Sequence, residues 1–419
     1  MVMSFRLKIQ MLFTYITLCI IAEMFYRRPL FTKSLSIEKE IFQTASPFFI
    51  WFLKQITKLG TQFIMLPIFI VFLIFIPLNK TYTYLSILVY ANYFDNLLKL
   101  IYGSPRPYWI NPSIFRICDG GFGNPSGHSF TSMSIYLSIW NIITDHKYFS
   151  STMLGKVAKV LLFFGFIGLT VLIMVSRLYL SVHSVNQIIH GALLGIGLYA
   201  FYFHVLELPK ATPEMFKKHI YSKTNIIVHT VVYSVCIVVI VFVYLYRHNN
   251  ELEYNDIIER LCPKLLPYRK FNNDGLFIAL TLMFGMGAYY GLVFLYYKLN
   301  TQFINKDSIV ITWNEVTSNK RRMYLLCAVW PFLAFMILFK VVPRDGSVFV
   351  FFVFGVSLPY LLTGFLLFGG YVYICVACQL ANKEFYTLPE ITRRPTDIVD
   401  YSKPGENKGS VTIEIQFNQ

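Results

Sequence analysis

The sequence predicts an all-α, polytopic membrane protein of about nine to ten transmembrane helices. Of its 419 residues, 56% are hydrophobic and 18% aromatic, whereas only 14% are charged. Soluble proteins carry about 25% charged residues, so this composition is typical of a chain that lives in a bilayer. The apolar residues also gather in long runs, and about 20 consecutive apolar residues are enough for a helix to cross the hydrocarbon core.

The formal net charge of +15 would also suit a nucleic-acid-binding protein. The Lys and Arg residues, however, lie mostly in connections between apolar runs, and no soluble basic domain carries them. That distribution favours contact with anionic lipid headgroups. We therefore expect membrane lipids as partners and no nucleic acid.

The N-terminal stretch resembles an uncleaved signal anchor. Its first 26 residues have a short basic start and then a run with few polar residues, but no small-residue cleavage site precedes Arg27, Arg28 and Pro29. The next segment, 36–59, mixes Glu and Lys with Phe, Ile and Trp51. Such a mixture predicts an amphipathic, interfacial segment rather than a span.

The remaining apolar runs give the rest of the predicted organisation. With the anchor, the candidate spans lie near 9–26, 60–78, 83–102, 127–145, 157–175, 184–206, 226–247, 276–298, 323–342 and 347–378. We divide the chain into an anchor and interfacial segment (1–59), a core bundle (60–206), additional C-terminal transmembrane helices (207–378) and a polar tail (379–419).

Charge predicts the orientation of these helices. Cytosolic loops are richer in Lys and Arg than loops on the other side. Lysines crowd the connections 79–82, 146–156 and 207–225, whereas the connections 103–126 and 176–183 have few cations. The latter pair should therefore face a lumen or the exterior. The loop 248–275 falls on the same side, which allows a disulfide between Cys118 and Cys262.

Three short motifs fall together at the lumenal ends of the predicted core helices. The stretch "KLIYGSPRP" places Lys99 at a helix end and Arg106 in the following loop. "NPSGHS" places Ser126, Gly127 and His128 at the start of the next helix, and "SRLYLSVHSVNQ" contains Arg177, His183 and Gln187.

Together these motifs read K-x6-RP, PSGH and SR-x5-H, and in that order they resemble the type-2 phosphatidic acid phosphatase superfamily. The resemblance covers about residues 60–206. It implies the six-helix-type phosphatase core bundle of the vanadium-haloperoxidase-like fold, and hydrolysis of a phosphate ester.

The residue types themselves suit a phosphate site. Lys99, Arg106 and Arg177 supply three cations, and Arg is adapted to bidentate phosphate contacts. Ser126 and Gly127 lie where a helix begins, and free backbone N–H groups at that end favour an anion. Gly127 also allows the backbone to approach the phosphate.

Two histidines complete the predicted chemistry. His183 would attack phosphorus in line to give a phosphohistidine, and His128 would protonate the leaving oxygen and later activate water. The residues that match them in the family hold these roles. Because cationic side chains stabilise the transferring group, no metal or other cofactor is required.

Gln187 departs from most of the superfamily, which has Asp at this position. One helical turn after His183, its carbonyl is expected to accept the Nδ1–H and orient the ring, without stabilising an imidazolium by charge. A Gln here, with "RPYW" and "SRLYLSVH", makes the chain most similar to the glucose-6-phosphatase branch. Asp95, one turn before Lys99, is expected to pair with it, and Asp119 to be a solvated loop acid.

Three functions remain open at this point. The first is a glucose-6-phosphatase-like membrane phosphatase acting on a soluble phosphomonoester at the lumenal face. The second is the same chemistry on a lipid phosphate, such as phosphatidate, a sphingoid-base phosphate or a polyprenyl pyrophosphate. The third is a non-catalytic subunit that meets membrane-protein partners through its extra C-terminal helices. The orientation favours the endoplasmic reticulum, with the mitochondrial inner membrane as the alternative.

Overall fold

The computed structural model describes residues 3–145, 147–248, 254–262, 276, 278–302 and 356–373, and every regular element in these ranges is helical. Five helices there are long and apolar enough to cross a membrane: Phe5–Thr44, Pro47–Leu73, Met153–Tyr179, Val185–Lys210 and Lys223–Arg247. The predicted all-α, multi-pass membrane fold is confirmed. The predicted span 323–342, the two ends of the predicted span 347–378 and the tail 379–419 lie outside the described residues, so the total of nine to ten spans stays a prediction.

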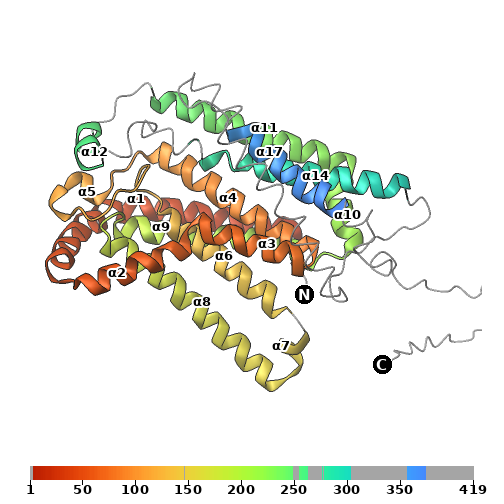
Figure 1. The fold of residues 1–419 in the computed structure, drawn as a ribbon, viewed down its shortest axis with the longest axis horizontal. Helices are drawn as coiled ribbons and strands as arrows, with labels where there is room; N and C mark the ends of the chain where they lie inside the picture. Colours follow the sequence, from red (N-terminus) through yellow and green to blue (C-terminus); the bar gives the residue numbers. More distant parts are fainter. Residues whose placement is uncertain are drawn as a thin grey trace, which may run out of the picture.

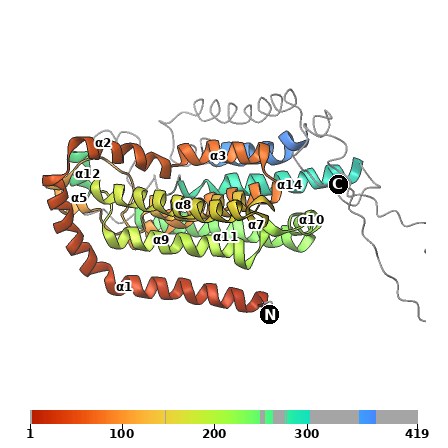
Figure 2. The same cartoon turned by 90° about the horizontal axis from the view of Figure 1, so that it is seen from below.

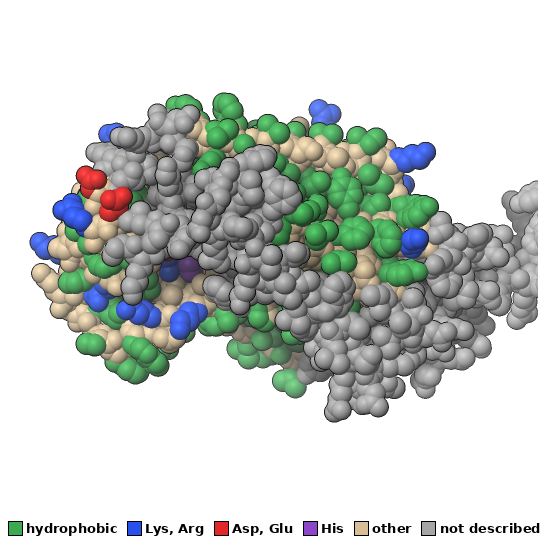
Figure 3. Space-filling view, turned by 45° about the horizontal axis from the view of Figure 1, so that its top comes forward, with side chains coloured by type: hydrophobic (Ala, Val, Ile, Leu, Met, Phe, Trp, Pro, Cys, Tyr) green, Lys and Arg blue, Asp and Glu red, His purple; other side chains and the backbone are tan. Residues whose placement is uncertain are grey.

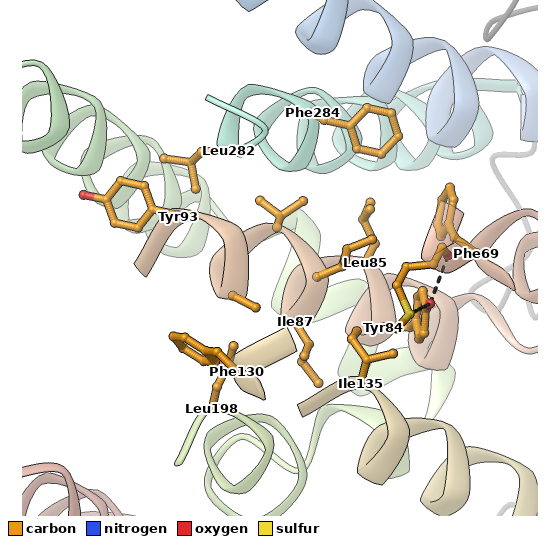
Figure 4. Close-up of a cluster of buried hydrophobic side chains, with 14 of the residues drawn as sticks. Phe69, Tyr84, Leu85, Ile87, Tyr93, Phe130, Ile135, Leu198, Leu282 and Phe284 are labelled. Atoms are coloured by element: carbon orange, nitrogen blue, oxygen red, sulfur yellow. Dashed lines mark hydrogen bonds between the residues drawn. The ribbon is translucent and has the colours of Figure 1, made fainter. Parts of the chain in front are cut away.

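A long central helix, α4 (Leu78–Tyr102), organises the core (Figures 1 and 4). Around it pack α3 (Gln62–Phe75), α6 (Gly127–Thr144), α9 (Val185–Ala200), α11 (Lys223–His248) and α14 (Leu282–Gln302). In Figure 4 the labelled side chains of α4 lie between α14 and the α6–α9 pair. Because protein surrounds α4, it tolerates polar residues that a lipid-facing helix would exclude, and it is not among the five apolar spans.

Close packing of α9 on α6 depends on two glycines. A Cβ atom at Gly191 would lie 2.5 Å from the Ser126 carbonyl oxygen, and one at Gly195 would lie 2.6 Å from the Phe130 carbonyl oxygen. Small residues let membrane helices approach backbone to backbone. The start of α9 is thereby held directly against the start of α6, where two of the three motifs lie. The helix α8 (Met153–Tyr179) packs on the other side of α6.

The N-terminal helix differs from the prediction. A single helix, α1 (Phe5–Thr44), replaces the separate anchor at 9–26 and the first part of the expected interfacial segment 36–59. Pro29 lies inside it, and α1 bends in Figure 2 rather than ending. Proline kinks a helix by removing one hydrogen bond, and membrane helices tolerate such a kink. The rest of 36–59 forms α2 (Pro47–Ile56) and the 3₁₀ turn Thr57–Gly60.

The C-terminal helix α14, which packs on α4, also packs on the helices that follow it in the described part of the chain (Figure 1). Here α14 packs tightly on α17 (Leu358–Phe365) and on the π-helical turn Leu366–Tyr371. The remaining elements are short: α5 (Pro107–Ile110), a 3₁₀ turn (Pro112–Ile114), α7 (Lys147–Ser151), a π-helical turn (Phe201–Val205), a 3₁₀ turn (Leu208–Lys210), α10 (Pro213–Tyr221) and α12 (Asn255–Leu261). In Figure 1, α5 and α12 lie at one end of the molecule and α10 at the other.

The two ends differ chemically. At the α10 end, Lys80 pairs with Asp145 at 2.5 Å and Lys8 pairs with Glu207 at 3.0 Å. At the α5 end, a disulfide joins Cys118 to Cys262, the pairing that the sequence allowed. In Figure 3, Lys and Arg side chains lie toward both ends, and hydrophobic side chains cover much of the described surface between them. Disulfides persist in oxidising compartments, which agrees with a lumenal or exterior α5 end.

Candidate active site

The motif residues meet at the α5 end of the core. Lys99 lies in the last turn of α4, and Gly103, which ends that helix with a φ of +57°, turns the chain toward Arg106. A residue with a side chain is strained in this left-handed conformation. The start of α6, the last turn of α8, the turn before α9 and the first turn of α9 bring the other residues to the same place: Ser126, Gly127, His128, Arg177, His183 and Gln187.

Arg106 is almost completely buried, with 1% of its side chain exposed. Its Nε donates to the Gly121 carbonyl at 2.8 Å and its Nη2 to the Gly120 carbonyl at 2.5 Å. Its Nη1 donates to the Val182 carbonyl at 2.9 Å and lies 3.3 Å from Nε2 of His183. The guanidinium group is thus fixed between the two loops that approach the site.

These contacts define the tautomer of His183. Because a guanidinium group only donates, Nε2 of His183 carries the lone pair and Nδ1 carries the proton. The Nδ1–H donates to the Gly123 carbonyl at 2.8 Å, whereas the Gln187 Oε1 lies farther away at 3.3 Å. Burial, and then the charges of Arg106 and Arg177, lower the pKa of His183 well below its ordinary value. The ring is therefore neutral near pH 7, and its Nε2 lone pair faces the Arg106 guanidinium group.

Gln187 makes other contacts besides the expected one. Its Nε2 donates to the Pro105 carbonyl at 2.9 Å, and its Oε1 accepts from the Ser184 backbone N–H at 3.3 Å as part of the capping box of α9. Its own backbone carbonyl accepts from the Ser126 N–H at 2.9 Å. Gln187 thus joins all three motifs, and the nearer acceptor for His183 is a backbone carbonyl that the sequence does not reveal.

Asp119 is not the solvated loop acid that the sequence suggested. It forms ion pairs with Arg106, at 3.3 Å, and with Arg177, and only 28% of its side chain is exposed. Burial alone would raise the pKa of this carboxyl, but the charges of the two guanidinium groups outweigh that effect and hold the pKa well below its usual range. A carboxylate therefore occupies the donors that a phosphate would use.

The expected pair between Asp95 and Lys99 is confirmed, with 2.8 Å between Oδ2 and Nζ. Gly127 lies directly against it, because a Cβ atom at this position would be 2.5 Å from the Asp95 Oδ2 and 3.1 Å from the Lys99 Nζ. The start of α6 and the end of α4 are therefore in contact. Ser126 is fully buried and accepts a hydrogen bond from the Ser129 hydroxyl at 3.0 Å.

His128 and Arg177 also lie in this cluster of charged side chains. His128 is half-buried in the first turn of α6, within the electrostatic reach of Lys99, Arg106, Arg177 and Asp119. Arg177 donates through Nη1 to the Thr57 hydroxyl at 2.9 Å, and its buried Nε has no acceptor among the described residues. Such a buried donor is costly unless a ligand accepts from it. Among the residues that the structure describes, no three His, Cys, Asp or Glu side chains are grouped so that they could hold a metal ion.

Comparison with known proteins agrees with this geometry. Residues 80–209 match the model of the PAP2 superfamily, so the chain carries a PAP2 superfamily domain and the resemblance inferred from the motifs is confirmed. The matched range contains every motif residue.

The curated relatives include the glucose-6-phosphatase catalytic subunit 1 of Canis lupus familiaris and of Rattus norvegicus. Each is 27% identical over 146 residues, which is 30% of this chain and 40% of the relative. Among solved structures, a transmembrane PAP2 type phosphatidylglycerolphosphate phosphatase from Bacillus subtilis is 22% identical, with a TM-score of 0.41 over 48% of this chain and 96% of that chain.

Proposed function

We propose that this protein is an integral membrane phosphatase that hydrolyses a phosphomonoester through a phosphohistidine on His183, without a metal, at the lumenal face. The observation that carries the proposal is the position of His183, whose Nε2 lies 3.3 Å from the buried guanidinium group of Arg106. A nucleophilic histidine needs an unprotonated ring nitrogen, and a phosphate dianion needs fixed cations close to it.

Each residue has a defined part in the proposed reaction. The phosphate oxygens replace Asp119 on Arg106 and Arg177, and Lys99 adds a third cation. Nε2 of His183 attacks phosphorus, the P–O bond to the leaving group breaks, and His128 donates a proton to that oxygen. His128 then takes a proton from water, which attacks phosphorus. The N–P bond breaks, and inorganic phosphate leaves.

A soluble sugar phosphate is our first substrate class, because the curated relatives are named glucose-6-phosphatase. A lipid phosphate is the second class, and it is favoured by the burial of the site residues inside a helix bundle that lies in a bilayer. We place the protein in the endoplasmic reticulum membrane. The Cys118–Cys262 disulfide at the α5 end supports a lumenal site there.

The test measures phosphate release by detergent-purified protein from glucose 6-phosphate, phosphatidate, a sphingoid-base phosphate and a polyprenyl pyrophosphate. We expect His183→Ala to abolish both release and the acid-quenched phosphohistidine. The matched control is His229→Gln, because His229 lies on α11 against Tyr289, away from the site. Release that survives in His183→Ala would refute the nucleophile. No release from any substrate by folded wild-type protein would favour the non-catalytic function.

A further inference from the structure

The bent N-terminal helix carries a buried acid next to the candidate active site. Glu23 lies on α1, its side chain is completely buried, and it falls outside the 80–209 range of the PAP2 domain. A buried carboxylate is costly unless it is paired and hydrogen-bonded. Arg27 supplies the pairing, since its Nε lies 2.8 Å and 2.9 Å from the two carboxylate oxygens and its Nη2 lies 2.5 Å from one of them.

The same carboxylate also reaches the motif loop. Nδ2 of Asn124 donates to the Glu23 Oε1 at 2.8 Å, although the two residues are 101 positions apart. Asn124 is completely buried and directly precedes the Pro125–His128 motif. A hydrogen bond to a charged group is stronger than a neutral one. Glu23 therefore holds Asn124, the residue that directly precedes the Pro125–His128 motif.

On its other side, this loop holds the nucleophile. Gly123, the neighbour of Asn124, provides the carbonyl that accepts the His183 Nδ1–H at 2.8 Å. The Gly123 N–H itself donates to the Ser104 carbonyl at 2.8 Å. A continuous path of short contacts therefore runs from α1 through the Gly123–Asn124 backbone to the imidazole ring.

We infer that Glu23 is a positioning residue for His183, acting through Asn124 and the Gly123 carbonyl, an inference that rests on the proposed function. The acceptor of Nδ1–H fixes the tautomer and the ring orientation, and both decide whether Nε2 points at phosphorus. Since that acceptor is a loop carbonyl, its place depends on what holds the loop. The N-terminal helix thus contributes to the reaction without contacting the substrate.

The experiment compares Glu23→Ala, Asn124→Ala and the double variant in detergent-purified full-length protein, with Tyr15→Phe as control. Tyr15→Phe removes another tie of α1, the hydroxyl donation to the Leu193 carbonyl at 2.9 Å, away from the loop. We expect kcat and the rate of phosphohistidine formation to fall about 10- to 100-fold in Glu23→Ala, with KM nearly unchanged. The double variant should lose no more than the worse single variant, and Glu23→Gln, which keeps an oxygen acceptor, should recover part of the rate.

Hydrogen exchange of the 121–128 backbone supplies a readout that does not require turnover. Faster exchange in Glu23→Ala, but not in Tyr15→Phe, supports the inference, and it does so even if the wild type releases no phosphate and the proposed function fails. Unchanged exchange at 121–128, or wild-type kcat in an active Glu23→Ala enzyme, overturns the inference. An equal loss of kcat in Glu23→Ala and Tyr15→Phe also overturns it, because α1 would then act only as general support.

Discussion

The substitution Gly127→Ala adds a single methyl group and tests the proposed phosphate-binding site. In the structure, that methyl carbon would lie 2.5 Å from the Asp95 Oδ2 and 3.1 Å from the Lys99 Nζ. Carbon atoms do not approach oxygen this closely, so the carboxylate has to move. Because Asp95 holds Lys99 at 2.8 Å, the ammonium group must move with it or lose its partner. The substitution therefore displaces a cation that we assign to phosphate binding.

The size of the effect follows from the cost of overpacking. Forcing an extra methyl group into a packed site costs about 1–3 kcal/mol. If the substitution raises the free energy of the transition state by that amount, kcat/KM falls about 5- to 150-fold. The assay is kcat/KM for the preferred substrate of the wild type, together with the inhibition constant of orthovanadate, which should rise.

Gly165→Ala is the matched control for this prediction. A Cβ atom at Gly165, on α8, has nothing within 4 Å. Alanine is favoured over glycine in a helix by about 1 kcal/mol, so we expect normal activity and equal or higher thermal stability. Gly127→Ala with the same kcat/KM and vanadate inhibition as Gly165→Ala would refute the close approach of α6 to the Asp95–Lys99 pair.

Three more predictions concern charge and cross-linking. The lowered pKa of His183 keeps its unprotonated form populated as the pH falls. We therefore expect kcat/KM to stay level down to the ordinary histidine pKa of about 6.5 and to decline only at lower pH. A decline in kcat/KM that is centred above that pH contradicts the assignment. Asp119→Asn removes a carboxylate that competes for two guanidinium groups, so KM and the vanadate inhibition constant should fall, by up to about tenfold, and a rise in either contradicts the competition. Cys118→Ser removes the bond to Cys262 and should lower the stability by about 2–5 kcal/mol. The midpoint of thermal unfolding in detergent measures this, and a midpoint equal to that of the wild type contradicts it.

The sequence could predict the fold class and the end of the bundle where the site lies. Apolar runs reveal spans because a bilayer imposes a length on them, and motif order predicted that Lys99, Arg106, His128, Arg177 and His183 would lie together. The path of α1 could not be read in the same way. A charged Arg-Arg-Pro stretch ends many apolar runs, whereas here Pro29 lies inside a helix that continues to Thr44.

Residues that act through loop conformation were the least predictable. Asp119 is 13 positions from Arg106 and 58 from Arg177, and neither spacing indicates a pair. Glu23 lies in a segment that resembles a simple anchor, and its partner Asn124 is 101 positions away. The available signal for Glu23 was physical: an acid within an apolar run is costly and therefore a functional candidate.

The Gln at position 187 is weak evidence for lost catalysis. A loss of catalysis would follow from Gln187 only if this side chain alone oriented His183, because an uncharged residue would then hold the imidazole ring poorly. The structure instead places the Gly123 carbonyl 0.5 Å nearer than the Gln187 oxygen, at 2.8 Å against 3.3 Å. Gln187 uses its amide to donate to the Pro105 carbonyl, a bond that a carboxylate could not make. A Gln therefore suits a site where a backbone carbonyl orients His183, and the non-catalytic function then rests on the extra C-terminal helices alone.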